Sequence, residues 1–96
     1  MRMNLNQLSV FYLAALHGSM SAAARELYVS PPAVTMQIKK LENWLGFNVF
    51  ERGQGELRLT ERGRDLYETL VPIFGQLENL ERYLKEVVET GEIEVR

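Results

Sequence analysis

Residues 61–90 of this chain carry a heptad pattern that only a long helix with a covered apolar face can satisfy. The apolar side chains are spaced alternately four and three residues apart, and they are Leu66, Leu70, Ile73, Leu77, Leu80, Leu84 and Val87. This spacing places them all on one face of a helix, as in a coiled coil. Pro72 removes one backbone hydrogen bond from that helix, so we expect a local kink and not a break.

The length of the predicted helix decides what can cover this apolar seam. Residues 61–90 would span about 45 Å at a rise of about 1.5 Å per residue. A globule of about 60 residues is only about 25–30 Å across. Residues 1–60 therefore cannot cover the whole seam, and we predict that a second copy of the chain does. The alternative is a bent helix that folds back onto its own domain.

Residues 1–60 have the pattern of a small helical domain with a hairpin. Apolar residues recur at helical spacing over residues 5–17, and Gly18 suits the end of that helix. Ser19 or Ser21 can cap a second helix, and the Ser30-Pro31 pair begins a third that ends at Gly46. Residues 49–52 and 56–59 are predicted to be the strands of the hairpin. The predicted fold is mainly α: a winged helix-turn-helix of three helices plus a β-hairpin wing, followed by a long dimerisation or linker helix.

Charge is distributed unevenly along the chain. The net charge is −2 at pH 7, which by itself argues against a nucleic-acid partner. Residues 1–60 carry six Lys and Arg against four Glu, whereas residues 61–96 carry five basic and nine acidic residues. Because phosphate binding depends on the local surface and not on the total charge, the weakly basic first part stays a candidate for DNA binding.

The third predicted helix has one apolar face and one free face. If Val34, Ile38 and Leu41 pack against the first two helices, the opposite face and the N-terminal end can enter a DNA major groove. The same pattern fits a plain three-helix bundle with a hairpin. It also fits a winged-helix module that binds no DNA and docks a partner protein through its long helix, or a fragment that dimerises without regulating.

Several motifs of the chain resemble those of LysR-type transcriptional regulators. They include Leu5-x-x-Leu8-x-x-Phe11, Gly18-Ser19-x-Ser21-x-Ala23-Ala24-x-x-Leu27, Val29-Ser30-Pro31-Pro32-Ala33-Val34-Thr35-Met36, Leu45-Gly46, Phe50-Glu51-Arg52 and Leu59-Thr60-x-x-Gly63. The resemblance implies sequence-specific binding of double-stranded DNA at an interrupted inverted repeat. It also implies a homodimer in which the 61–90 helices pair antiparallel through the seam residues, with a tetramer open for longer members of the family.

The resemblance also implies which residues face DNA. They are Ser19, Ser21, Ser30, Pro31, Pro32, Thr35, Met36, Lys39, Lys40, Arg52 and Arg58. The serines lie at helix N-termini, which can receive a phosphate, and the two arginines flank the wing, where an arginine can enter a narrow minor groove. Many family members have Gln at position 31 and Arg at position 36. This chain has Pro31 and Met36, so two base-reading hydrogen-bonding side chains are missing.

The resemblance divides the chain into three parts. Residues 1–60 are the DNA-binding domain, residues 61–90 the dimerising linker helix, and residues 91–96 a hinge toward an effector-binding domain. Family members are about three times as long and bind a small-molecule co-inducer in that further domain. We therefore expect this chain to be part of a longer protein, with no effector pocket of its own.

Other classes of function have little support in the sequence. The chain has no cysteine and one histidine, so we expect no metal site and no cofactor. No general base is placed beside a nucleophile, so we expect no enzyme. No apolar run approaches the roughly 18 residues of a membrane span, and the N-terminus lacks the order of a signal peptide. A cytoplasmic protein is expected.

Overall fold

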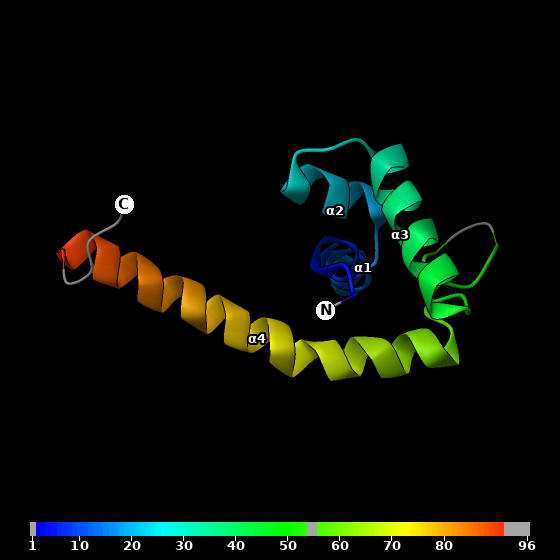
Figure 1. The fold of residues 1–96 in the computed structure, drawn as a ribbon. Helices are drawn as coiled ribbons and strands as arrows, with labels where there is room; N and C mark the ends of the chain where they lie inside the picture. The colour runs from blue at the N-terminus through cyan, green and yellow to red at the C-terminus, as the bar shows by residue number, and fades with distance from the viewer. Residues whose placement is uncertain (1, 54–55, 92–96) are drawn as a thin grey trace.

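The computed structural model describes residues 2–53 and 56–91, and these are mainly helical. They contain four helices, α1 (Leu5–His17), α2 (Met20–Leu27), α3 (Pro31–Leu45) and α4 (Glu61–Thr90) (Figure 1). The predicted limits of α1, α3 and α4 are confirmed, and of the two serines considered as the cap of the second helix it is Ser19 that caps α2. Residues 92–96, to which we assigned most of the hinge, lie outside the described residues.

Local side chains begin each helix, and left-handed residues end it. A side-chain oxygen accepts a hydrogen bond from the backbone N–H three residues ahead at Asn4, Ser19, Ser30 and Thr60. The C-terminal caps of α1, α3 and α4 are glycines at positive φ. α2 ends instead at Tyr28, with φ of 57°, a conformation that costs a side chain other than glycine about 1–2 kcal/mol. The tight turn between α2 and α3 is therefore set by a strained residue.

The first three helices pack around one apolar core. α1 lies across both α2 and α3 and supplies its centre, including Phe11, which is fully buried. Ala23 and Ala24 of α2 are also buried, and their small side chains let α2 approach its neighbours closely. α3 turns Val34, Ile38 and Leu41 inward, as the sequence predicted. The opposite face of α3 is consequently left exposed.

The predicted strands of the β-hairpin wing are not confirmed. Among the described residues, Phe50 and Leu59 form only an isolated antiparallel bridge. Two backbone hydrogen bonds flank it, from Glu51 N–H to the Arg58 carbonyl (2.8 Å) and from Thr60 N–H to the Val49 carbonyl (3.0 Å). A pair of segments without a third strand gains little from longer pairing. The predicted turn residues Gln54 and Gly55 lie outside the described residues. We call residues 49–53 and 56–60 the wing segment.

α4 is one continuous helix of 30 residues with Pro72 inside it. It bends near its middle in Figure 1, so the predicted kink without a break is confirmed. Its first part lies against the head, which we define as residues 2–53 and 56–60, and the rest extends away from it (Figure 1). The described residues measure 50 × 25 × 20 Å. The alternative in which this helix folds back onto its own domain is wrong for these residues.

Candidate nucleic-acid interface

The exposed face of α3 brings together most of the residues predicted to read DNA. Pro31, Pro32, Thr35, Met36, Lys39 and Lys40 are all exposed there. The first five of them line a single shallow hollow. Thr35 Oγ1 donates a hydrogen bond to the Pro31 carbonyl (3.2 Å), so the hydroxyl proton of Thr35 is already used within the helix.

The three predicted serines lie at the N-terminal ends of α2 and α3. Ser19 Oγ accepts from Ala22 N–H (3.1 Å) and Ser30 Oγ accepts from Ala33 N–H (3.3 Å). Both are helix caps, and each satisfies one backbone donor. The first turn of α2 has further N–H groups that can receive a phosphate, whereas Pro31 and Pro32 give the start of α3 no such donors. Ser21 is exposed in the first turn of α2. Ser19 is half-buried, and it is the least accessible of the residues predicted to contact DNA.

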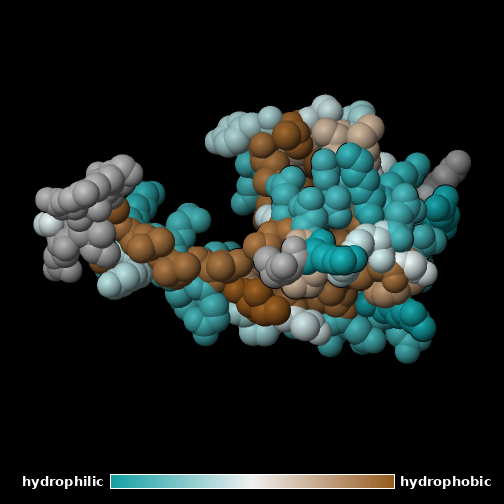
Figure 2. Space-filling view, in the orientation of Figure 1, coloured by the Kyte–Doolittle hydropathy of each residue, from teal (hydrophilic) through white to brown (hydrophobic). Residues whose placement is uncertain are grey.

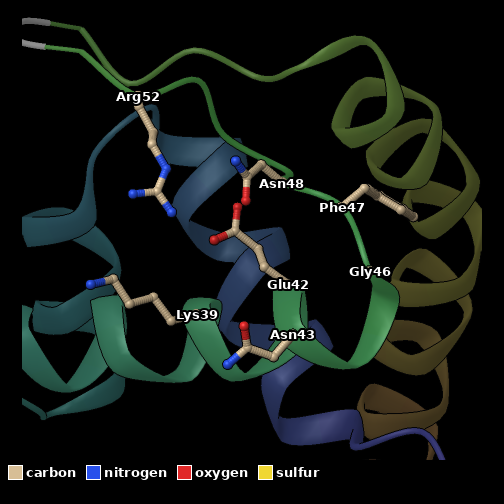
Figure 3. A pocket seen from close by; sticks show the side chains of 7 residues that line it. All are labelled: Lys39, Glu42, Asn43, Gly46, Phe47, Asn48 and Arg52. Carbon is tan, nitrogen blue, oxygen red and sulfur yellow. The ribbon is translucent and has the colours of Figure 1, made fainter.

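A second hollow lies between α3 and the segment that follows it. It has a volume of about 420 Å³ and is lined by Lys39, Glu42, Asn43, Gly46, Phe47, Asn48 and Arg52. Lys39 rises from α3 and Arg52 reaches down from the wing segment, so their charged ends approach the same space (Figure 3). The lining has two cations and one carboxylate. The structure therefore brings together two predicted DNA-binding residues that come from different segments, Lys39 from α3 and Arg52 from the wing segment.

Glu42 ties the wing segment to α3. Its Oε2 accepts a hydrogen bond from Val49 N–H at 2.7 Å. A carboxylate that accepts from a backbone donor makes a stronger hydrogen bond than a neutral acceptor does. Through this contact the first residue of the wing segment is held at a defined distance from the exposed face of α3.

Thr60 and Gly63 tie the same segment to the start of α4. Thr60 Oγ1 donates to the Asn48 carbonyl (2.7 Å) and accepts from Gly63 N–H (2.9 Å). Gly63 is buried, and a Cβ atom there would lie 2.0 Å from the Val49 carbonyl oxygen. Only a glycine fits this close approach of α4 to the wing segment. The wing segment is consequently clamped between α3 and α4.

Both predicted wing arginines belong to one hollow of the wing segment. Arg52 and Arg58 line a hollow of about 260 Å³ together with Glu51, Gly53 and Glu56. Both arginines are exposed. The two glutamates in this lining offset their charge, so the positive surface here is weaker than the arginines alone suggest.

The predicted dimerisation seam divides into two parts. Leu66 and Leu70 pack against the core of the same head, and Leu70 is buried. Ile73, Leu77, Leu80 and Leu84 are 44–49 % exposed, and Figure 2 shows an apolar band along the part of α4 that leaves the head. Val87 is buried. Four of the seven seam residues therefore present an uncovered apolar stripe.

Three aromatic rings join the head to α4. The ring of Tyr12 in α1 stacks on Tyr67 (5.5 Å between centroids) and on Phe74 (4.6 Å). Burial raises the pKa of Tyr12 above its ordinary value, and the nearby Tyr67 and Glu78 add to this shift. We call these three residues the aromatic clamp. It lies on either side of Pro72, where α4 changes direction.

Some residues that shape this surface were not predicted from the sequence. Phe47 and Asn48 line the hollow beside Lys39, and Glu42 and Gly63 position the wing segment. A glycine inside a helical pattern often marks close packing, so Gly63 carried a usable signal. The described residues contain no group of three or more His, Cys, Asp or Glu that could hold a metal ion. Nor does any described helix have the length and apolarity to span a membrane.

Comparison with known proteins places this arrangement in a family. In curated proteins, the HTH-type transcriptional regulator CfxR of Cupriavidus necator is 41 % identical over 95 residues, which are 97 % of this chain and 30 % of the relative. Among solved structures, the BenM_DBD/catB site 1 DNA complex has a TM-score of 0.77 at 26 % identity, covering 90 % of this chain and 96 % of that one.

One part of a full-length structure is also similar to this chain. The virulence activator AphB of Vibrio cholerae has a TM-score of 0.79 at 26 % identity, covering 85 % of this chain and 28 % of its own. This chain thus spans less than a third of the full-length relatives it matches. The family model described as "Bacterial regulatory helix-turn-helix protein, lysR family" matches residues 5–64, from α1 through the wing segment into α4. The chain therefore belongs to the lysR family of bacterial regulatory helix-turn-helix proteins.

Proposed function

We propose that this chain binds double-stranded DNA sequence-specifically, as the DNA-binding part of a dimeric LysR-type transcription regulator. The observation that carries the proposal is the exposed face of α3 with cations beside it. The first turns of α3 offer Pro31, Pro32 and Thr35 to a major groove, and Lys39 and Arg52 share the hollow behind them. The matched structures that are DNA complexes, those of BenM_DBD and CbnR_DBD, support the same role.

The wing segment and α3 would straddle one DNA strand in this arrangement. If α3 enters a major groove and the wing segment lies over the adjacent minor groove, the sugar-phosphate strand between the grooves passes between them. The hollow lined by Lys39, Asn43, Asn48 and Arg52, which also holds the Glu42 carboxylate, would then face that strand. The amides and cations there are suitable donors for a phosphate. Ser19 and Ser21, at the N-terminus of α2, are proposed to meet a second phosphate.

The division into parts that we propose follows the same geometry. Residues 1–60 read DNA, residues 61–90 pair two copies, and residues 91–96 lead toward the remaining length that the relatives have. The exposed stripe of Ile73, Leu77, Leu80 and Leu84 supports pairing, because four large apolar residues on one helix face are rarely left in water. Two heads paired in this way suit an operator with two half-sites in inverted repeat.

Selection of bound sites from random duplex DNA, followed by titration of the best site at two salt concentrations, tests the proposal. The wild-type protein should bind the selected site at least about 1,000-fold more tightly than random DNA. Replacing both Lys39 and Arg52 with alanine should weaken binding strongly and reduce the slope of log affinity against log salt by about two. Equal affinity for selected and random DNA would overturn sequence-specific binding.

A control variant loses the same number of positive charges at positions away from the proposed interface. Arg82 and Lys85 are exposed on the part of α4 beyond the head, so replacing both with alanine removes the same charge. Their substitution should leave the affinity and the salt slope close to wild type. If both double variants weaken binding equally, the effect comes from net charge and not from this interface. A wild-type protein that binds no duplex selectively would fit better as a module that binds a protein partner through α4.

A further inference from the structure

The hollow on the exposed face of α3 is unusual for a base-reading surface because it is mostly apolar. It has a volume of about 440 Å³ and is lined by Pro31, Pro32, Thr35, Met36 and Lys39. Met36 is 57 % exposed, so its thioether is available to a ligand. We propose that this hollow receives the C5 methyl group of a pyrimidine in the major groove, from either thymine or 5-methylcytosine. The proposal rests on the proposed DNA binding and names what the α3 face reads.

Hydrogen-bond donors are scarce in this hollow. The prolines have no backbone N–H. The hydroxyl of Thr35 donates to the Pro31 carbonyl (3.2 Å), and the side chain of Ser30, at the edge, is engaged with Ala33 N–H (3.3 Å). Lys39 is the one side chain in the lining with donors to spare. The purine edges that line a major groove are read mainly by donors to N7 and O6, so this hollow is poorly suited to them.

An apolar hollow does match one feature of the major groove. The C5 methyl group is the apolar element among the base edges that face this groove, and thymine carries it. Contact with carbon atoms of proline, threonine and methionine removes that methyl from water. Burial of one methyl group changes affinity by roughly fourfold.

The apolar hollow and the cationic hollow share one lining residue, Lys39. Lys39 also lines a further hollow, of about 170 Å³, which reaches Arg52 and Met20. A strand whose phosphate lies near Lys39 and Arg52 would therefore bring its bases toward Met36. The same docked duplex can occupy both hollows.

Exchange of thymine for uracil in a selected site tests the proposal. It removes the C5 methyl group of the base and leaves all its hydrogen-bonding groups in place. Each thymine of the tightest selected duplex is replaced in turn by deoxyuridine, and the dissociation constant is measured at one salt concentration. We expect a roughly fourfold loss at one position in each half-site and none elsewhere. At that position, 5-methylcytosine is then compared with cytosine, both opposite guanine. A roughly fourfold gain from the methyl there as well shows that either pyrimidine serves, and no gain assigns the hollow to thymine.

A substitution links the methyl effect to Met36. In Met36→Ala the ratio of affinities for thymine and uracil should fall toward one, because the wall of the hollow is shortened. Met36 is exposed and alanine favours a helix, so the variant should fold. Met3→Ala is the control, since Met3 is also exposed but precedes α1, and its ratio should stay near four.

The failures of this proposal and of DNA binding are distinguishable. Tight, selective binding with no uracil-sensitive position would overturn methyl recognition and leave the proposed function standing. A uracil effect that persists unchanged in Met36→Ala would overturn the assignment to this hollow. Absence of any selective binding would overturn the proposed function itself.

Discussion

Two glycines of α4 show how one residue decides how two elements meet. A Cβ atom at Gly63 would lie 2.0 Å from the carbonyl oxygen of Val49, which is backbone and cannot rotate away. A Cβ atom at Gly75 would meet nothing within 4 Å. The same substitution therefore tests close packing at the first position and helix propensity at the second.

We expect Gly63→Ala to lower the free energy of unfolding by about 1–3 kcal/mol, because the wing segment must move away from α4. Gly75→Ala should raise it by up to about 1 kcal/mol, because alanine favours a helix more than glycine does. Urea unfolding followed by circular dichroism, at one protein concentration, measures both changes. Similar effects of the two substitutions would contradict the close approach at Gly63.

Tyr12, the central ring of the aromatic clamp, should make stability depend on alkaline pH. Burial first, and then Tyr67 and Glu78, raise the pKa of its phenol above the ordinary value of 10.0. Below that value the phenol is neutral in both folded and unfolded chains and adds no pH dependence. Above it the unfolded chain loses the proton first, so the folded state loses stability as the pH rises through the raised pKa.

Replacement of Tyr12 with phenylalanine removes this titration. We expect the wild-type free energy of unfolding to fall between about pH 8 and about pH 11, and Tyr12→Phe to lose less over the same range. Tyr28→Phe is the matched control, because Tyr28 is 95 % exposed and should behave as wild type. The prediction fails if Tyr12→Phe loses stability as steeply as the control.

The helices can be predicted from the sequence because their limits are set by neighbouring residues. Ser30 followed by Pro31 begins α3, Gly46 ends it, and Thr60 begins α4. Each of these signals acts within one turn of the chain. The continuous heptad spacing likewise requires only that one helix persist through Pro72.

The wing and the site are less predictable because they depend on contacts distant in sequence. Alternation at Leu57 and Leu59 predicted strands, but the hydrogen bonds of this region go to Glu42, to Thr60 and to a single antiparallel bridge. Local propensity does not report such contacts. The same holds for Asn48, whose place beside Lys39 and Arg52 follows only from how the wing segment returns to α3, whereas Asn43 lies one helical turn after Lys39 on α3 itself.

The outer part of α4 should depend on a partner for its own helical structure. Beyond the aromatic clamp its large apolar residues are exposed, apart from Val87, and most of the stability of a helix in a protein comes from the packing of its apolar face. Replacing both Leu77 and Leu80 with glutamate should convert a dimer into a monomer and reduce the helical signal. Sedimentation at a protein concentration on the order of tens of micromolar and circular dichroism measure the two effects.

Gln76→Glu provides the control for added charge, because Gln76 is exposed on α4 but does not belong to the seam. It should sediment as wild type does. Wild-type protein that is monomeric at this concentration, or a double glutamate variant that stays dimeric, would refute pairing through the seam.

At the scale of the whole molecule, the orientation of α4 is fixed relative to the head. The clamp of Tyr12, Tyr67 and Phe74 and the contact of Gly63 with Val49 hold the first part of α4 against the head. If α4 pairs with a second copy, the two α3 faces are held at a fixed separation and rotation. Joined heads then bind a two-site duplex much more tightly than separate heads, because the second binding step is intramolecular.

This coupling predicts a strict dependence on the spacing of half-sites. Inserting about five base pairs, half a helical turn, turns one half-site to the opposite face of the duplex, and we expect affinity to fall by at least about tenfold. Inserting about ten base pairs restores the face but increases the separation, so affinity should recover only in part. Fluorescence anisotropy at fixed salt measures each duplex. The double glutamate variant, whose heads are separate, should show no spacing dependence, and a wild-type protein equally indifferent to spacing would mean that its heads bind independently.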